Sequence, residues 1–343
     1  MVKIGLIGAG FMGGTHAACY EALSGNGCFR VTAVADLHGE RAGKLAAKFG
    51  AKVYLSGREL IEKGDVNAVD ICLPTYLHTE HALAAMENGY HVFIEKPVCL
   101  HEHEAVKLLE MKKKTGVQAA VGHCIRFWPE YVYLKKLVDS NTYGKFISGV
   151  FKRISPRPLW GEEWLLDGKK SGSAALDLHI HDVDYVRYIL GIPDCIKGEL
   201  TTVNGNNEHI FSLYKYKDAE VSIEGGWDYP SGMPFEMEYR VKFEKAAVIF
   251  NSGRTPSLML YNEDGTIIQP VPEQEFDSKS EGLGGNLSSL GGYYNEIKYF
   301  LECLKNGDAV KVAPLEEGIE SFRLTMKEIK AAGLAVGNRG ALN

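Results

Sequence analysis

A glycine-rich turn between a strand and a helix restricts the possible folds of this chain more than any other feature. Residues 2–8 (VKIGLIG) form a short, mostly apolar run of strand length, and a helical pattern extends from the turn to about Leu23. The turn itself reads Gly8-Ala9-Gly10-Phe11-Met12-Gly13. GxGxxG has a defined physical meaning when it follows a strand and opens a helix, because this is the arrangement that binds a dinucleotide.

Each part of the turn has its own task in that arrangement. Gly8 allows the tight turn, Gly10 lets the backbone approach a pyrophosphate, and Gly13 lets the helix pack on the strand. The start of the helix, with Phe11 and Met12, supplies amide donors and partial positive charge to the phosphates. We therefore expect residues 8–13 to bind a dinucleotide cofactor.

An acidic residue follows the second predicted strand. Asp36 directly follows residues 30–35 (RVTAVA). At this position a carboxylate is expected to accept hydrogen bonds from the adenosine ribose. A carboxylate in this place repels a 2′-phosphate, so NAD is favoured over NADP, although Arg41 nearby keeps NADP possible. The alternative is that Asp36 only caps the helix that starts near Glu40.

Strand-like and helix-like runs keep alternating up to about residue 122, which predicts a parallel sheet with helices on both faces. Ligands bind at the carboxyl ends of the strands in such sheets. Two segments lie at such strand ends: Pro74-Thr75-Tyr76-Leu77-His78, which follows the predicted strand ending at Leu73, and Glu95-Lys96-Pro97. We expect Lys96 to point into the cofactor crevice, whereas the alternative is an ordinary surface lysine at a strand end.

Residues 171–191 (SGSAALDLHIHDVDYVRYILG) are predicted to form one helix, with Ser171 or Ser173 as its cap. Asp177 and His181 are four residues apart and would share one face of it. A carboxylate beside an imidazole raises the basicity of the ring and fixes its orientation, which suits proton transfer. The alternative for His181 is a core histidine that Asp177 satisfies.

A metal site at His179 and His181 is a second possibility for this stretch. Residues two apart lie on opposite sides of a helix, however, and the sequence offers no other His/Cys cluster to complete the ligands. We therefore predict no metal.

The second half of the chain follows a different pattern. A long strand over 145–155 precedes a loop with Trp160 and Trp164, and several strand-like runs with short turns occupy 195–268. They predict a large, mostly antiparallel open sheet with helices on one face. The other face would be exposed unless a second subunit covered it, so we expect an oligomer. The polar, glycine-rich run 272–292 is predicted to be a long loop that could order over the substrate.

Composition limits the function classes. A length of 343 residues suits two domains, and a net charge of −6 argues against a nucleic-acid partner. Seven scattered cysteines without a CxxC pair indicate reduced thiols. The chain shows no signal peptide and no run long enough to span a membrane, so we expect a cytoplasmic protein that does not contact membranes.

The residues above resemble the Gfo/Idh/MocA family, which includes glucose–fructose oxidoreductase and inositol 2-dehydrogenase. The resemblance covers nearly the whole chain and is carried by GAGFMG, Asp36, PTYLHTEHALAAMENGYHVFIEKP and DLHIHDVD. The Glu95-Lys96-Pro97 triplet followed by D-x-x-x-H is its most specific part. The family often has three glycines before the aspartate and D-x-G-x-H, where this chain has Ser171-Gly172-Ser173 and His179, so the substrate is not carried over.

The resemblance implies an α/β Rossmann dinucleotide-binding domain, residues 1–123, and an α+β domain for substrate binding and oligomerisation, residues 124–343. It implies a homodimer or homotetramer formed through the C-terminal sheet. It also implies hydride transfer between NAD(P) and a secondary hydroxyl or ketone of a sugar, cyclitol or related derivative. The alternatives within the family are a glycosidase that uses NAD for transient oxidation and a non-catalytic NAD-binding sensor.

The same resemblance assigns roles to residues. Lys96, Asp177 and His181 form the catalytic set. Apart from the resemblance, we expect specificity residues between Arg153 and Trp164, so the expected substrate contacts are Lys96, Asp177 and His181 together with Arg153 and Trp164. The cofactor is contacted at Gly8, Gly10, Phe11, Met12, Gly13, Asp36, Leu73, Pro74, Thr75, His78, Glu95, Lys96 and Arg126. His181 is expected to act as the general base and Lys96 to stabilise the reacting oxygen.

Overall fold

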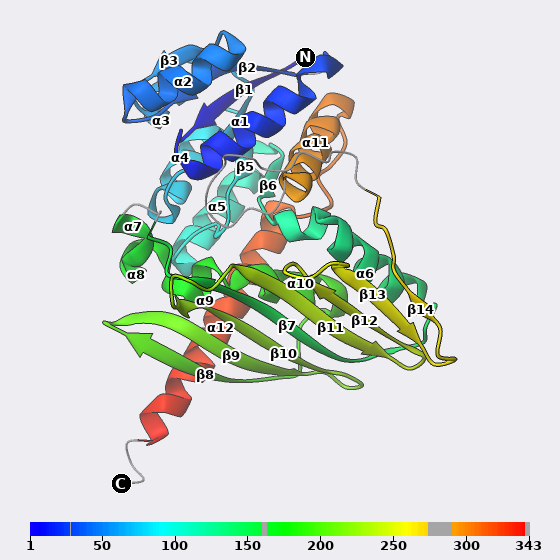
Figure 1. Ribbon diagram of the computed structural model, residues 1–343. Helices are drawn as coiled ribbons and strands as arrows, with labels where there is room; N and C mark the ends of the chain where they lie inside the picture. The colour runs from blue at the N-terminus through cyan, green and yellow to red at the C-terminus, as the bar shows by residue number, and fades with distance from the viewer. Residues whose placement is uncertain (28, 160–162, 274–289, 340–343) are drawn as a thin grey trace. The chain divides into compact units, whose positions relative to one another are not determined.

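The computed structural model describes residues 1–343 except 28, 160–162, 274–289 and 340–343. Trp160 and most of the predicted loop 272–292 therefore lie outside the described residues. The chain forms two compact units (Figure 1). The first contains residues 1–128 and 290–320, and the second contains 129–273 and 321–339. The sequence predicts a single boundary after residue 123, so that each domain is one continuous segment. Each observed unit instead combines two separate segments of the chain.

The first unit is built on a six-stranded sheet in the order β3-β2-β1-β4-β5-β6. All five pairings between neighbouring strands are parallel, as predicted. The strands are β1 (Val2–Ile7), β2 (Phe29–Ala35), β3 (Lys52–Tyr54), β4 (Ala68–Ile71), β5 (His91–Ile94) and β6 (Ala119–Val121). This strand order is the doubly wound arrangement in which ligands bind at the carboxyl ends of the strands.

Helices cover both faces of this sheet. In β1, Ile4 and Leu6 pack into the cluster formed with α1, while Gly5 on the opposite face would place a Cβ 2.6 Å from Leu60 in α3. The helices of the unit are α1 (Phe11–Leu23), α2 (Gly39–Phe49), α3 (Gly57–Lys63), α4 (His78–Glu87), α5 (Glu102–Thr115) and α11 (Gly291–Asn306). Short 3₁₀ turns are η1 (Ser24–Asn26), η2 (Thr75–Leu77) and η3 (Cys124–Phe127).

Helix α11 belongs to the first unit because of its apolar face. Leu290, Ile297 and Leu301 pack in one buried cluster with residues of α1, β1 and β2. Helix α12 (Leu315–Arg339) follows; its first turns belong to the first unit and its remainder to the second.

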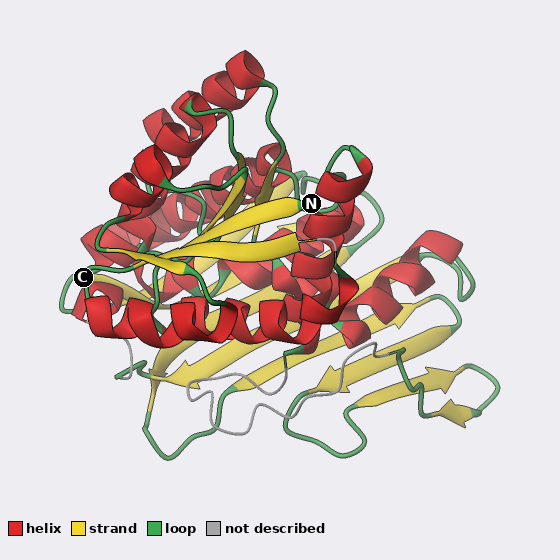
Figure 2. Cartoon of the chain, turned by 90° about the horizontal axis from the view of Figure 1, so that it is seen from above, coloured by secondary structure: helices red, strands yellow, loops and turns green. Residues whose placement is uncertain are grey.

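The second unit is built on an eight-stranded sheet in the order β14-β13-β12-β11-β7-β10-β9-β8. Only the β7–β10 pairing is parallel, so the predicted antiparallel character is confirmed. In Figure 2 its long strands lie side by side with short connections between most of them. The strands are β7 (Phe146–Pro156), β8 (Cys195–Val203), β9 (Asn206–Lys215), β10 (Glu220–Tyr229), β11 (Glu236–Phe243), β12 (Ala246–Asn251), β13 (Leu258–Asn262) and β14 (Ile267–Ile268).

The two faces of this sheet differ in what covers them. On one face, Tyr131 of α6 (Pro129–Ser140) makes edge contacts with Tyr239 and Phe250, and further helices pack beside it. On the opposite face Phe211 is 49% exposed and Leu213 45% exposed. Strand residues alternate between a helix-covered and an open side, as expected for a sheet packed on one face only.

The predicted single helix over 171–191 is wrong. The structure has three short helices before Gly191: α8 (Gly168–Ser171), α9 (Ser173–Asp177) and α10 (Ile180–Leu190), preceded by α7 (Glu163–Leu166). Gly172 has φ +82°, which ends α8. Asp167, not Ser171 or Ser173, caps α8 by accepting the amide hydrogen of Lys169. A second break follows α9, where the amide of His179 donates to the carbonyl of Ala174, five residues earlier.

Candidate functional site

The glycine turn of the first unit has the geometry expected of a phosphate cradle. Gly8 has φ +100°, and a Cβ there would lie 2.4 Å from the carbonyl oxygen of Cys72. A Cβ at Gly13 would lie 1.9 Å from the carbonyl oxygen of Gly8, so the helix closes directly on the turn. A Cβ at Gly10 would have no described heavy atom within 4 Å.

The start of α1 is available to an anion. Gly10 occupies its N-cap, makes no side-chain cap hydrogen bond, and no acidic residue occupies the first turn. Phe11 and Met12 begin the helix and are half-buried. Open space at Gly10 together with an uncapped helix N-terminus fits the pyrophosphate of a dinucleotide.

Asp36 lies at the carboxyl end of β2, immediately beside this turn. Its Oδ2 accepts the amide hydrogen of Ala9 at 2.7 Å, and its Oδ1 accepts that of His38 at 2.7 Å. His38, not Asp36, is the N-cap of α2. The carboxylate is thus fixed against the glycine turn, where a ribose hydroxyl is expected.

The carboxyl end of β4 carries a second fixed group. His78 is buried, with Nδ1 2.8 Å from the carbonyl oxygen of Pro97 and Nε2 2.7 Å from that of Leu73. Burial lowers the pKa of His78, while the two carbonyl oxygens oppose this shift. His78 therefore ties the Leu73–Thr75 segment to the segment that follows β5. Pro74 and Thr75 form the first turn of that β4 connection.

The carboxyl end of β5 carries Glu95 and Lys96. Glu95 is buried, and its Oε2 accepts the backbone amide hydrogen of Lys96 at 3.0 Å. Lys96 is half-buried at this strand end. Arg126 in η3 is 4% exposed and lies 3.5 Å from the Glu317 carboxylate of α12, so its charge is already partnered.

Asp177 and His181 lie in the second unit on either side of the break between α9 and α10. Asp177 is the last residue of α9 and is half-buried, while His181 is the second residue of α10 and is 8% exposed. The two residues therefore do not share one continuous helix face.

Neighbours of this dyad hold the segment in place. His179 is fully buried, donates through Nε2 to Glu328 Oε1 at 2.9 Å, and packs so closely that a Cβ at Gly225 would lie 2.4 Å from its Nδ1. Tyr214 donates to the other Glu328 oxygen at 3.1 Å. His179 thus points into the sheet and serves as an anchor, which the sequence did not reveal because Glu328 is 149 residues away.

Arg153 and Trp164 also lie in the second unit. Arg153 is 4% exposed, donates from Nε to Asp182 Oδ2 at 2.8 Å, and lies with Nη2 3.4 Å from the Tyr131 hydroxyl. Trp164 is half-buried against an apolar cluster that includes Trp227. Direct contacts of these two residues with substrate stay predictions.

A buried polar cluster in the first unit was not predicted from the sequence. His16 in α1 has Nδ1 2.8 Å from Asp70 Oδ2 and Nε2 3.0 Å from Glu95 Oε1, and all three side chains are buried. Glu296 of α11 reaches the same cluster. A signal was available: Asp70 interrupts the apolar strand 68–71, and a carboxylate in a central parallel strand requires a partner.

Glu296 is expected to make the stability of the folded protein depend on pH. Neither carboxylate oxygen has a hydrogen-bond partner among the described residues, and burial and the Glu95 charge raise the pKa of Glu296 well above its usual value. The folded protein therefore keeps this proton at pH values where the unfolded chain has lost it, so stability falls as pH rises above about 4.5. Glu296→Gln removes this loss, and its melting temperature should exceed that of the wild type by a few degrees at pH 8 but hardly at pH 5.

Thermal unfolding of both proteins between pH 5 and pH 8 measures this difference. A difference in melting temperature that is constant, or that favours the wild type more as pH rises, would contradict a protonated Glu296. Glu302→Gln, on the exposed side of the same helix, is the matched control.

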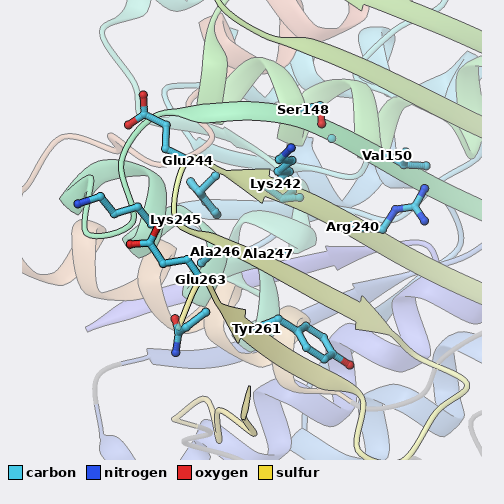
Figure 3. A pocket seen from close by; sticks show the side chains of 14 residues that line it. Ser148, Val150, Arg240, Lys242, Glu244, Lys245, Ala246, Ala247, Tyr261 and Glu263 are labelled. Atoms are coloured by element: carbon cyan, nitrogen blue, oxygen red, sulfur yellow. The ribbon is translucent and has the colours of Figure 1, made fainter. Parts of the chain in front are cut away.

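A hollow of about 470 Å³ lies on the second unit's sheet and is shown in Figure 3. Its lining comes from β7, β11, β12 and β13 and includes Val150, Arg240, Lys242 and Tyr261. It contains none of the predicted site residues.

The fold and the glycine turn define the first unit as a dinucleotide-binding unit of the Rossmann type. Residues 2–123 match a family described as an oxidoreductase family with an NAD-binding Rossmann fold, and residues 131–249 match the GFO/IDH/MocA C-terminal domain. The chain belongs to the GFO/IDH/MocA oxidoreductase family.

Individual relatives agree with this membership. Inositol 2-dehydrogenase of Rhizobium meliloti (strain 1021) is 32% identical over 342 residues, covering 96% of this chain and 96% of that protein. The scyllo-inositol 2-dehydrogenase (NAD(+)) of Bacillus subtilis (strain 168) is 25% identical over 334 residues, covering 93% and 90%. A solved structure of levoglucosan dehydrogenase with NADH and levoglucosan superposes with a TM-score of 0.83 at 20% identity, covering 97% of both chains.

Proposed function

We propose that this protein is an NAD-dependent dehydrogenase that oxidises a secondary hydroxyl group of a sugar, cyclitol or related derivative and reduces the corresponding ketone. The main support is the first unit, in which the open glycine cradle, Asp36 and the Glu95-Lys96 strand end occur on one parallel sheet. Further support comes from relatives that span nearly the whole chain and are named inositol dehydrogenases. The absence of a glycine at His179 leaves the choice of polyol open.

NAD rather than NADP is the proposed cofactor. The Asp36 carboxylate sits against the amides of Ala9 and His38 and would repel a 2′-phosphate placed at the same hydroxyl. Gly8, Gly10 and Gly13, with the amides of the first turn of α1, would hold the pyrophosphate. Leu73, Pro74, Thr75, His78 and Glu95 would line the nicotinamide end.

In the proposed reaction His181 removes the proton from the substrate hydroxyl as a general base. Asp177 would orient the imidazole and stabilise the imidazolium that forms. Lys96 would donate a hydrogen bond to the reacting oxygen and stabilise its developing negative charge. The bound nicotinamide supplies the acceptor for the hydride that leaves the carbinol carbon. In the reverse direction His181 returns the proton.

The remaining predicted residues take supporting roles in this proposal. Arg153 fixes Asp182, the residue after His181, and so would act on substrate mainly through the position of α10. Trp164 would contribute an apolar surface to a sugar ring, and Arg126 would border the cofactor.

We further propose a homodimer or homotetramer formed through the open face of the large sheet, which the mass in solution would test. The exposed apolar residues Phe211, Leu213 and Tyr261 on that face support a second copy as the cover. Among the described residues no helix is long and apolar enough to cross a membrane. Cys19, Cys72, Cys195 and Cys303 are reduced thiols, which supports a reducing, cytoplasmic setting.

NADH formation, followed by absorbance, tests the proposed function. The panel consists of inositols, aldoses, 1,5-anhydrosugars and nucleotide sugars, each with NAD and with NADP, and with Lys96→Ala as the control enzyme. We expect turnover of at least one polyol, faster with NAD than with NADP, and lost in the control. Sugar release without net NADH would instead identify a glycosidase. Cofactor binding with no turnover across the panel would argue against the dehydrogenase.

A further inference from the structure

His16 occupies the centre of the buried cluster in the first unit. It lies on the second turn of α1, the helix whose first turn forms the glycine cradle. Its Nδ1 is 2.8 Å from Asp70 Oδ2 on β4, and its Nε2 is 3.0 Å from Glu95 Oε1 after β5. One imidazole therefore joins a helix to the ends of two neighbouring strands.

Backbone also fixes the Glu95 carboxylate. Its Oε2 accepts the amide hydrogen of Lys96 at 3.0 Å, and a Cβ at Gly122 would lie 3.0 Å from its Oε1. The backbone at Gly122 thus packs closely against the carboxylate that His16 contacts. The hydrogen bonds run without interruption from His16 through Glu95 to the backbone of Lys96.

The Asp70 side of the ring is equally constrained. The Tyr20 hydroxyl donates to Asp70 Oδ2 at 2.9 Å, and the Cys72 sulfur lies 3.3 Å from His16 Nδ1. The ring also makes edge contact with Phe93, with centroids 5.7 Å apart. His16 therefore has no room to adopt another orientation without breaking these contacts.

The charges of the cluster are consistent with a ring that donates from both nitrogens. Burial alone would lower the pKa of His16, but the adjacent Asp70 carboxylate, together with Cys72, holds it well above the usual value. Burial would raise the pKa of Glu95, yet its hydrogen bond to His16 holds it below the usual value. The titratable groups that face the ring and Glu95 come from five elements: Cys19 and Tyr20, Asp70 and Cys72, Lys96, His78, and Tyr293 and Glu296.

We propose that His16 is a positioning residue for Lys96: by donating to both Asp70 and Glu95 it fixes the strand end that carries the lysine relative to the glycine turn at the start of α1. One side chain thereby sets the distance between the two ends of the dinucleotide site. The inference rests on the proposed role of Lys96 in the reaction.

NADH affinity measured by fluorescence titration between pH 6 and pH 9 tests this role. In His16→Gln both donor hydrogens are on one nitrogen, so the amide cannot span the two carboxylates as Nδ1 and Nε2 of the ring do, and Glu95 loses the imidazolium that it accepts from. We expect NADH to bind about tenfold more weakly, with an affinity that now changes with pH as Glu95 takes up a proton. The control is Tyr20→Phe, which removes a hydrogen bond to Asp70 from the same helix but leaves the His16–Glu95 contact, and it should bind NADH as the wild type does.

Several outcomes would overturn the inference. One is a His16→Gln variant that matches the wild type in NADH affinity at every pH, and another is a Tyr20→Phe variant that weakens binding to the same extent. His16, Glu95 and Glu296 place ligand atoms within 4.8 Å of one another. If the purified wild type contained one metal ion per chain and His16→Gln lost it, the cluster would be a metal site and not a set of hydrogen bonds. This outcome would also overturn the inference.

If His16→Gln does not fold, the wild type itself provides the measurement. Nitrogen NMR of protein labelled with ¹⁵N-histidine reports the protonation of each ring, and His16 is identified by its proximity to the Phe93 and Tyr293 rings. Both ring nitrogens of His16 should carry protons at about pH 7.5, well above the ordinary histidine pKa of about 6.5, and a neutral ring overturns the inference. None of these measurements needs a substrate. The substrate panel can therefore contradict the proposed dehydrogenase activity while these measurements support the role of His16, or the reverse.

Discussion

Replacing Lys96 with alanine is expected to lower kcat by about 10²–10⁴, and His181→Ala should have an effect of similar size. The proposed chemistry separates charge at the reacting oxygen, and each variant removes one of the two groups that handle this charge. Lys96 would stabilise the oxygen, whereas His181 would accept its proton. NADH affinity should change far less than kcat, because neither group is proposed to hold the pyrophosphate or the adenosine.

Steady-state kinetics with protonated and deuterated substrate measure both effects. Chemistry should become fully rate-limiting in the variants, so the deuterium isotope effect on kcat should reach its largest value. Lys44→Ala is the control for a lysine, since its side chain is 74% exposed and pairs only on the surface with Glu40. His103→Ala, at an exposed position of α5, is the control for a histidine. Near-normal turnover in both Lys96→Ala and His181→Ala would refute the assignment.

The fold of the first unit could be predicted from the sequence because its signals are local. Strand, glycine turn and helix follow one another within residues 2–23, and Asp36 comes directly after the next strand. Alternating apolar strands and helices then specify a parallel sheet without any knowledge of distant contacts. The antiparallel sheet was predictable for the same reason, since its strands are joined mostly by short turns.

The break in the segment 171–191 could not be predicted from the sequence. Leu176, Ile180 and Val183 keep helical spacing through the break, so periodicity gives no sign of it. The break arises from a wide turn at His179, and His179 is held by Glu328, which spacing alone cannot connect to it. Asp182 similarly meets Arg153 from β7, so a residue predicted to touch substrate is committed to a buried ion pair.

The His16 cluster shows a related limit. The two carboxylates that contact His16 are far from it in sequence: Asp70 is 54 residues away, and Glu95 is 79 residues away. A buried charge in a central strand indicates that a partner must exist. Only the fold identifies His16 as that partner and places it against Glu95, the residue before Lys96.

Gly13→Ala and Gly10→Ala should separate the two tasks of the glycine turn. A methyl group at Gly13 would overlap the Gly8 carbonyl oxygen, so we expect a loss of about 3 kcal/mol in stability together with loss of NADH binding. A methyl group at Gly10 would meet no atom of the described residues within 4 Å, so Gly10→Ala should melt like the wild type. It should nevertheless bind NADH at least about tenfold more weakly, about 1.4 kcal/mol, because the methyl group occupies the space through which the pyrophosphate approaches.

Gly14→Ala is the matched control for this pair. It lies next to Gly13 within α1, and a Cβ there also has open space. Alanine at this helical position should keep or raise the melting temperature and preserve NADH affinity, since no phosphate is expected at it. Thermal unfolding and NADH fluorescence titration of the three variants measure both quantities on the same samples. If Gly10→Ala and Gly14→Ala bound NADH equally well, the pyrophosphate would not lie over Gly10, and the placement of the cofactor on this turn would be wrong.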